Sequence, residues 1–201
     1  NVIEEDQVKI VEIQTTEKMP RRVTLVARGT PGHGSRPTLT NSVAILANAV
    51  AKAGSWRTEV RLNETTRSYF QRLADISTAE DAKRYRNVDD PDQSEAIQEH
   101  FLASYPYHYS ISRTSVVPTV MDAGFRKNVI PSEASAVLDI RMLPDENVEE
   151  FYAQLAAVID DSRVEIVPES IYRPAAPPSN IDNEMFQTLE QVAIEMYPSA
   201  T

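Results

Sequence analysis

VTLVARGTPGHGSRP, residues 23–37, joins an apolar run to a glycine-rich turn, and the rest of the chain is organised around it. Its first five residues, 23–27, are apolar or β-branched and predict a buried strand. The turn contains three of the five glycines of the chain. Glycines permit positive φ angles and close approach of backbones. His33 therefore lies on a tight turn at a strand's end, where binding groups concentrate. The alternative is an ordinary turn whose histidine is solvated.

Outward from this stretch, the apolar residues follow helix and strand periods. Residues 41–53 and 147–159 carry apolar residues at spacings of three and four and predict amphipathic helices. Asn147 is the expected N-cap of the second helix, and Gly54 is the expected end of the first. Alternating or β-rich runs predict further strands, at residues 8–13, 114–121, 134–142 and 163–167.

The order of these elements predicts the fold class. From residue 23 the core runs strand, helix, strand, strand, helix, strand, which is the split βαβ pattern. We therefore expect an α+β, ferredoxin-like α/β sandwich, with a four-stranded antiparallel sheet and two helices on one face. Pro118 cannot donate to a strand ladder, so residues 114–121 are expected to lie at an edge or to carry a bulge.

Two segments stand outside this core. Residues 63–104 are polar and predict a helical insertion with short helices at 65–74, 78–85 and 93–102. Residues 173–178 are rich in proline and predict an extended linker, which a last amphipathic helix at 183–196 follows.

The composition excludes several classes of function. The chain has 201 residues, a net charge of −10 and no cysteine. The negative charge argues against binding to nucleic acid and to anionic membrane surfaces. No apolar run approaches the length of about 20 residues that spans a bilayer. Without cysteine, thiolate metal sites, disulfides and cysteine nucleophiles are excluded.

The histidines do not form a metal-binding motif. His33, His100 and His108 lack the short spacings that assemble a metal site from one element. His100 lies on a polar helical segment and is expected to be solvated. His108 lies in the aromatic run of residues 105–109, which favours packing over ligation. Nucleophile-elbow and phosphate-loop motifs are absent as well, so the residues alone do not make a complete active site.

A second candidate site lies between the two consecutive strands. Asn128, in the loop of residues 124–131, offers an amide donor and an acceptor. Arg141, at the end of the following strand, offers a planar fork that suits a carboxylate. The alternative is that Asn128 forms a turn and that Arg141 pairs with a surface acid.

Three motifs in this order resemble a known family. GTPGHGSRP at 29–37, NVIP at 128–131 and DIR at 139–141 resemble the dimerisation (lid) domain of the co-catalytic di-zinc exopeptidases. That family includes glutamate carboxypeptidase, aminoacylase, carnosinase-type dipeptidases and succinyl-diaminopimelate desuccinylase. Glu17 and Lys18 also resemble its carboxypeptidase-like branch. The resemblance covers about residues 10–172, with 63–104 as an elaboration.

The resemblance implies roles for the candidate residues. His33 matches the histidine that reaches into the active site of the partner subunit of a homodimer and stabilises the oxyanion. Asn128 and Arg141 match substrate-contacting positions, with the arginine placed for a substrate carboxylate. The implied substrate is a peptide or an N-acyl amino acid, and the implied cofactor is a pair of zinc ions in a separate catalytic domain.

The zinc ligands and the general base of that family have no counterpart in these residues. We therefore expect a piece of a longer enzyme that by itself binds no catalytic zinc and hydrolyses nothing. Its expected parts are a leading strand from the catalytic-domain junction (1–22), a lid and dimerisation domain (23–172), and a linker and helix that return to the absent catalytic domain (173–201). The alternative is a free-standing ferredoxin-like module that binds a small ligand or self-associates through the edge strand at 114–121.

Overall fold

The structure is a computed structural model that describes residues 2–4, 7–170, 174 and 176–201. The chain folds into two compact units. The sheet unit comprises residues 18–58 and 114–175, and the helical unit comprises residues 1–17, 59–113 and 176–201. Each unit has a buried core of its own.

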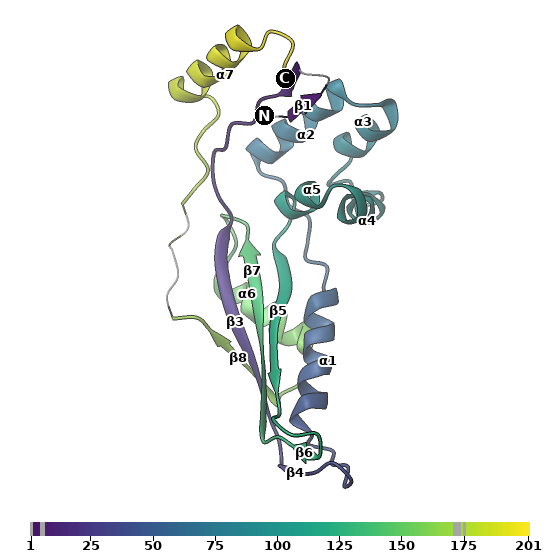
Figure 1. Cartoon of the computed structure of the whole chain (residues 1–201). Coiled ribbons are helices and arrows are strands. Elements are labelled where there is room, and N and C mark those ends of the chain that lie inside the picture. Colours follow the sequence, from purple (N-terminus) through teal and green to yellow (C-terminus); the bar gives the residue numbers. More distant parts are fainter. Residues whose placement is uncertain (1, 5–6, 171–173, 175) are drawn as a thin grey trace. The chain divides into compact units, whose positions relative to one another are not determined.

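Four antiparallel strands form the sheet unit. They are β3 (Met19–Arg28), β5 (Ser115–Ala123), β7 (Glu133–Met142) and β8 (Val164–Pro168). The spatial order is β5-β7-β3-β8, and every neighbouring pair is antiparallel (Figure 1). The third core strand therefore lies between the first and the second, as a split βαβ arrangement requires. This confirms the predicted ferredoxin-like sheet.

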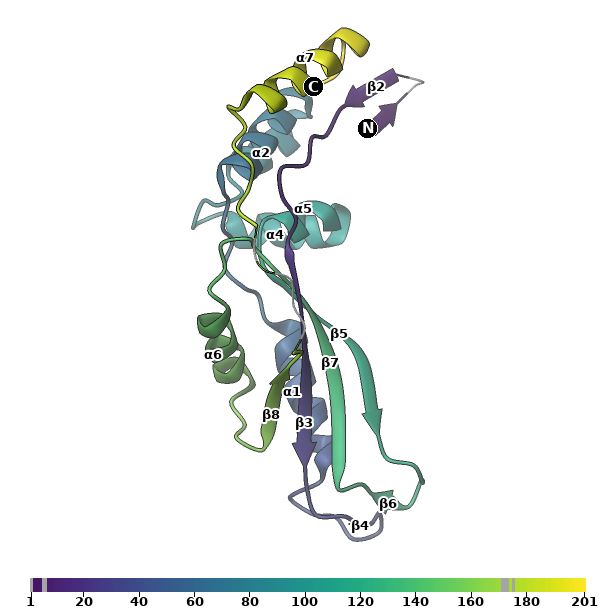
Figure 2. The same ribbon diagram turned by 90° about the vertical axis from the view of Figure 1, so that its left-hand side faces the viewer.

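Two helices cover one face of this sheet. They are α1 (Ser42–Ser55) and α6 (Val148–Ile159), and they pack against each other as well as against the strands (Figure 2). Burial alternates along β7, where every second side chain from Ala134 to Met142 is buried. The inward side chains of the strands meet the apolar faces of the helices in one core, which includes Leu25, Leu46, Leu138, Phe151 and Leu155.

The predicted N-cap of α6 is confirmed, whereas the predicted end of α1 is wrong. The Asn147 side chain accepts a hydrogen bond from the Glu150 N–H, which confirms the predicted cap. The predicted end at Gly54 is wrong, because α1 continues through Gly54 to Ser55. A β-carbon on Gly54 would lie only 3.1 Å from Cγ of Pro118. The glycine therefore serves the close contact between α1 and β5, not the termination of the helix.

Strand β5 is the edge strand that Pro118 predicts. It lies at the end of the strand order, and its register against β7 shifts between Pro118 and Val120. The proline therefore occurs both at an edge and beside a bulge, where its missing N–H is tolerated.

The helical unit contains the predicted insertion. Three of its helices, α2 (Glu64–Ile76), α3 (Ala79–Arg86) and α4 (Ser94–Ser104), correspond to the predicted ones and extend slightly beyond them. A fourth, α5 (Pro106–Ile111), was not predicted. The core of the helical unit is aromatic: the rings of Phe70, Tyr85 and Phe101 contact one another at centroid distances of 5.8 to 6.0 Å.

The two termini join the same unit. The hairpin of β1 (Val2–Glu4) and β2 (Gln7–Ile10) is shorter than the strand predicted at 8–13. The Thr201 N–H donates to the Lys9 carbonyl at 2.9 Å, so the last residue of the chain meets the first strands. The last helix, α7 (Glu184–Met196), follows the predicted range, and its Glu190 pairs with Arg72 of α2.

Part of the predicted linker at 173–178 lies outside the described residues, as does the expected boundary at 172. Among the helices that the structure describes, none combines the length and the apolar content that a membrane crossing requires.

Candidate functional site

His33 and Asn128 come together at one end of the sheet unit. Strand β4 (Gly32–His33) pairs with β6 (Val129–Ile130), and His33 is opposite Val129 (Figure 1). The pairing continues beyond the strands, because the Gly34 N–H donates to the Asn128 carbonyl at 2.8 Å. We call this two-stranded hairpin and its loops, residues 29–41 and 124–131, the tip. The tip thus brings together two predicted site residues that are 95 positions apart in the sequence.

The His33 ring is exposed and has three polar neighbours in the tip. Its Nδ1 lies 2.8 Å from Oγ of Ser35 and accepts a hydrogen bond from the Ser35 N–H at 3.2 Å. Its Nε2 lies 3.4 Å from Nδ2 of Asn128. The turn therefore holds the Nδ1 edge of the ring. The Nε2 edge lies beside the Asn128 amide on the exposed surface of the tip.

The glycines of the tip are used for space and not for positive φ angles. Gly29, Gly32 and Gly34 do not adopt the positive φ that glycine permits; Gly124 is the positive-φ glycine of the described chain, with φ of 75°. Gly29, however, lies against the backbone of Thr40, and a β-carbon there would be 1.7 Å from the Thr40 carbonyl oxygen. A side chain at this position would force apart the two ends of the loop that carries His33.

Arg141 lies at the other end of the sheet. Strand β7 begins at Glu133, two residues after the tip, and Arg141 is its penultimate residue. The Arg141 guanidinium pairs with Asp139, with Nε 3.0 Å from Oδ1 and Nη2 3.0 Å from Oδ2. The sequence placed Asn128 and Arg141 in one candidate site, but the fold groups Asn128 with His33 and leaves Arg141 apart.

Lys18 is a further charged group beside Arg141. Its Nζ donates to Oγ of Ser115, which is opposite Arg141 in the pairing of β5 with β7, at 3.2 Å. Burial, and then the positive charge of Arg141, lower the pKa of Lys18 to about 8. Sequence reasoning identified Lys18 only as part of a family-like Glu-Lys pair, because its proximity to Arg141 depends on strand pairing.

The other two histidines lie in the helical unit. His108 is surrounded by aromatic rings, among them Tyr85 and Tyr105 at centroid distances of 5.3 Å, which confirms the expected packing role. Burial lowers its pKa. His100 is half-buried and not solvated as expected, because it lies beside Tyr105 of the same aromatic cluster. Its Nε2 is 3.9 Å from Oδ1 of Asp81, beyond hydrogen-bond distance.

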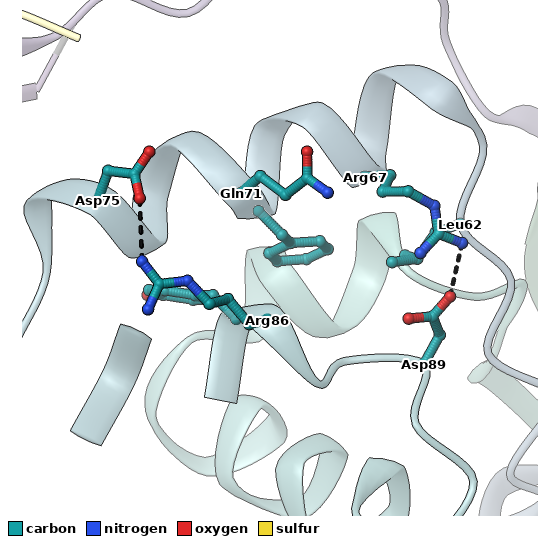
Figure 3. A pocket seen from close by; sticks show the side chains of 8 residues that line it. Leu62, Arg67, Gln71, Asp75, Arg86 and Asp89 are labelled. Carbon is teal, nitrogen blue, oxygen red and sulfur yellow. Dashed lines mark hydrogen bonds and ion pairs between the residues drawn. The ribbon is translucent and has the colours of Figure 1, made fainter. Parts of the chain in front are cut away.

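A pocket of about 400 Å³ also lies in the helical unit. Its inner wall includes Phe70, and an ion pair closes each end: Arg67 with Asp89 and Arg86 with Asp75 (Figure 3). All four charges are thus matched by partners on the pocket rim. None of the predicted site residues lines it.

The described residues do not form a metal site. They contain no group of three or more histidine, aspartate or glutamate side chains that could hold a metal ion. The described residues therefore offer no set of ligands for the zinc pair that the family resemblance implies.

Comparisons with known proteins agree with this architecture. A family model described as a peptidase dimerisation domain matches residues 15–166. A probable carboxypeptidase S-like 2 of Dictyostelium discoideum is 28% identical over 190 residues, which cover 94% of this chain and 36% of that protein. A human N-fatty-acyl-amino acid synthase/hydrolase is 27% identical over 191 residues, covering 94% of this chain and 38% of that protein. The chain thus spans little more than a third of the length of these relatives.

Solved structures share the fold. A metallo-carboxypeptidase from Sulfolobus solfataricus superposes with a TM-score of 0.60 at 16% identity, over 98% of this chain and 53% of that one. A dipeptidase from Saccharomyces cerevisiae superposes with a TM-score of 0.54 at 14% identity, over 98% of this chain and 46% of that one. At these identities the likeness is one of architecture.

Proposed function

Because the chain belongs to the peptidase dimerisation domain family of the M20 peptidases, we propose that it is the lid and dimerisation domain of a longer amide-hydrolysing enzyme. In this proposal two copies of the domain associate. His33 and Asn128 of one subunit act in the active site of the other, and Arg141 acts in the active site of its own subunit.

The separation of the tip from Arg141 carries this proposal. From Glu133 to Arg141, β7 advances by eight residues, which corresponds to about 27 Å of extended strand. A dipeptide spans only about 7 Å. One chain therefore cannot present His33 and Arg141 to the same small substrate. Two copies, with the tip of each directed at the other subunit, can present both groups.

The tip is suited to stabilise a developing negative charge. When water attacks an amide carbonyl, its oxygen becomes negative, and donors already in place lower the barrier. The His33 imidazole and the Asn128 amide are such donors, and they lie 3.4 Å apart on a braced hairpin. Hydrogen bonds within the tip hold the backbone beside Asn128 and one edge of the His33 ring in place, so the hairpin itself need not rearrange during the reaction.

Arg141 is suited to bind a carboxylate. A guanidinium has five N–H donors; Asp139 accepts a hydrogen bond from Nη2 at Oδ2, and its Oδ1 lies within ion-pair distance of Nε. Donors on Nη1 and Nη2 remain for a second anion. The related carboxypeptidase-like protein and the N-fatty-acyl-amino acid synthase/hydrolase are consistent with a substrate that ends in a free carboxylate. We therefore propose a peptide or an N-acyl amino acid as the substrate.

Two exposed apolar surfaces support the proposed assembly. On the edge strand β5, Val117, Val120 and Met121 are each about half exposed, and an unpaired edge is a template for a second copy. Along α7, five large apolar side chains are exposed: Met185, Leu189, Val192, Ile194 and Met196. We propose that α7 packs against the remainder of the longer enzyme, which holds the zinc ions and the general base.

The test is the turnover of the longer enzyme with His33→Ala. Removal of one oxyanion donor typically lowers kcat by about 10²- to 10³-fold, and we expect that loss with a small change in KM. His100→Ala, in the helical unit, is the matched control and should retain the parent rate. An unchanged kcat in His33→Ala would contradict the catalytic role and favour the alternative of a ligand-binding or self-associating module.

A further inference from the structure

The turn that carries His33 also holds one nitrogen of its ring. The Ser35 N–H donates to Nδ1 at 3.2 Å, and the Ser35 hydroxyl lies 2.8 Å from the same atom. The backbone of this turn is itself fixed. The Arg36 N–H donates to the His33 carbonyl at 2.9 Å, and the Gly34 N–H donates to the Asn128 carbonyl at 2.8 Å. The N–H that contacts Nδ1 is therefore part of the folded backbone, and the Ser35 hydroxyl adds a side-chain contact to the same atom.

The backbone N–H of Ser35 determines which ring nitrogen carries the proton. A hydroxyl can donate or accept, so Oγ of Ser35 is compatible with either neutral tautomer of His33. A backbone N–H can only donate. It requires a lone pair on Nδ1, and a proton there would place two N–H groups against each other. The neutral ring therefore carries its proton on Nε2, since the bond made by one ring nitrogen sets the state of the other.

This tautomer changes the meaning of the contact with Asn128. Nε2 of His33 and Nδ2 of Asn128 lie 3.4 Å apart, and with a proton on Nε2 both are donors that cannot bond to each other. They can, however, donate to one oxygen placed between them. In the opposite tautomer, Nε2 would accept from the Asn128 amide, and the ring would have no outward donor left.

We propose that Ser35 is a positioning residue: its backbone N–H keeps Nδ1 of His33 unprotonated, its hydroxyl holds the orientation of the ring, and together they direct Nε2–H, with the Asn128 amide, at a single oxygen of the substrate. The substrate part of this inference rests on the proposed function, whereas the tautomer rests on the turn alone. When no substrate is present, a half-turn of the Asn128 amide would bring its oxygen to Nε2–H and satisfy the same donor.

The tautomer can be measured in the 201-residue chain itself. Long-range ¹H–¹⁵N spectra of the ¹⁵N-histidine-labelled chain, recorded where the rings are neutral, distinguish a protonated ring nitrogen from an unprotonated one. The His33 signals are assigned by their loss in His33→Gln. We expect a protonated Nε2 and an unprotonated Nδ1. Ser35→Ala retains the backbone N–H and should therefore keep the same tautomer. A proton on Nδ1, or an even mixture of the two forms, in the parent chain would overturn the inference.

The positioning role is tested by turnover of the longer enzyme. Loss of a group that orients a functional histidine typically costs 10- to 100-fold. Ser35→Ala keeps the N–H that sets the tautomer and removes only the hydroxyl contact with Nδ1, so we expect a loss of kcat at the lower end of this range, about tenfold, with KM within about twofold. Ser35→Thr restores the hydroxyl and should restore the rate.

The outcomes separate this inference from the proposed function. If His33→Ala is impaired but Ser35→Ala retains the parent kcat, the positioning role of the Ser35 hydroxyl is wrong and the proposed function stands. If His33→Ala retains its kcat, the proposed function fails, and the tautomer is still decided by the spectrum.

Discussion

His33 and Arg141 lie at opposite ends of the sheet unit, His33 in the two-stranded tip and Arg141 near the end of β7. His33 is paired with Val129 just before β7 begins, and Arg141 is the penultimate residue of β7. Strand β7 therefore acts as a spacer of about 27 Å. At one end lie His33 and Asn128, the proposed donors to an oxyanion, and at the other lies Arg141, the proposed cation for a substrate carboxylate. A rigid spacer of this length suits a domain that serves two active sites.

We expect Gly29→Ala to destabilise the chain by about 2 kcal/mol or more, since overpacking of this kind typically costs 1–3 kcal/mol. The new β-carbon would lie 1.7 Å from the Thr40 carbonyl oxygen, so the backbone must move. Gly32→Ala is the matched control, because its nearest atom would be a flexible Ile130 methyl at 3.9 Å. Urea unfolding of the two variants checks this. Equal midpoints would show that Gly29 is not under steric constraint.

Lys18→Met is expected to stabilise the chain at neutral pH. Burial lowers the pKa of Lys18 from 10.5 to about 8. Between these values the unfolded chain holds a proton that the folded chain has lost, so the free energy of unfolding rises with pH across this window. Below pH 8 the folded chain carries the full cost of the buried ammonium group. Removing it should add on the order of 1 kcal/mol at pH 7.

The advantage of Lys18→Met should shrink as the pH rises from 8 to 10.5. Thermal or urea unfolding at a series of pH values measures it. Lys127→Met, at an exposed position of the tip, is the control for the loss of a lysine charge without loss of a buried group. An advantage of Lys18→Met that is the same at pH 7 and pH 10.5 would contradict the shifted pKa.

His108→Phe should make the helical unit less sensitive to acid. Burial lowers the pKa of His108 below 6.5, although the carboxylates of Glu12 and Asp81 partly offset it. As the pH falls below 6.5, the unfolded chain takes up a proton that the folded chain resists, so stability is lost. Phenylalanine keeps the aromatic packing and cannot titrate. Hydrogen exchange of α2 and α4 between pH 7 and 5 checks this, and parallel losses in both proteins would contradict it.

Arg141→Met should reduce discrimination between a substrate with a free carboxylate and its carboxamide analogue. A hydrogen bond to a charged group is worth about 1.5–3 kcal/mol, so we expect the ratio of kcat/KM values to fall by about 10- to 100-fold. Arg141→Lys should recover only part of it, because an ammonium lacks the fork geometry. A ratio that does not change would remove Arg141 from the substrate site.

The sequence predicts the strands and helices of the sheet unit well because each of them is marked by a pattern within its own residues. The alternation along β7 and the apolar faces of α1 and α6 identify the core without knowledge of their partners. Pro118 identifies the edge strand for the same reason. Helix α5 was missed because its six residues are too few to show a helical period and begin with Pro106, which suits a first helical turn but is equally common in loops.

What the sequence could not predict depends on contacts between distant residues. The pairing of His33 with Val129 involves two-residue strands that carry no alternation. The placement of Lys18 beside Ser115 and Arg141 follows from strand order alone. The grouping of both termini with the helices depends on bonds such as Thr201 to Lys9. The sequence assigns Asn128 and Arg141 to one candidate site because they lie on a loop and on the strand that follows it. A sequence does not show that this strand carries Arg141 away from the loop.

The central claim is that His33 acts in the active site of the partner subunit, and mixed dimers test it most directly. One subunit carries His33→Ala, and the other has an intact His33 but is inactivated outside residues 1–201. Each variant alone should be inactive. If the account is correct, the mixed dimer recovers activity, because the intact tip of one subunit reaches the intact centre of the other. Mixed dimers that form but stay inactive would contradict the account.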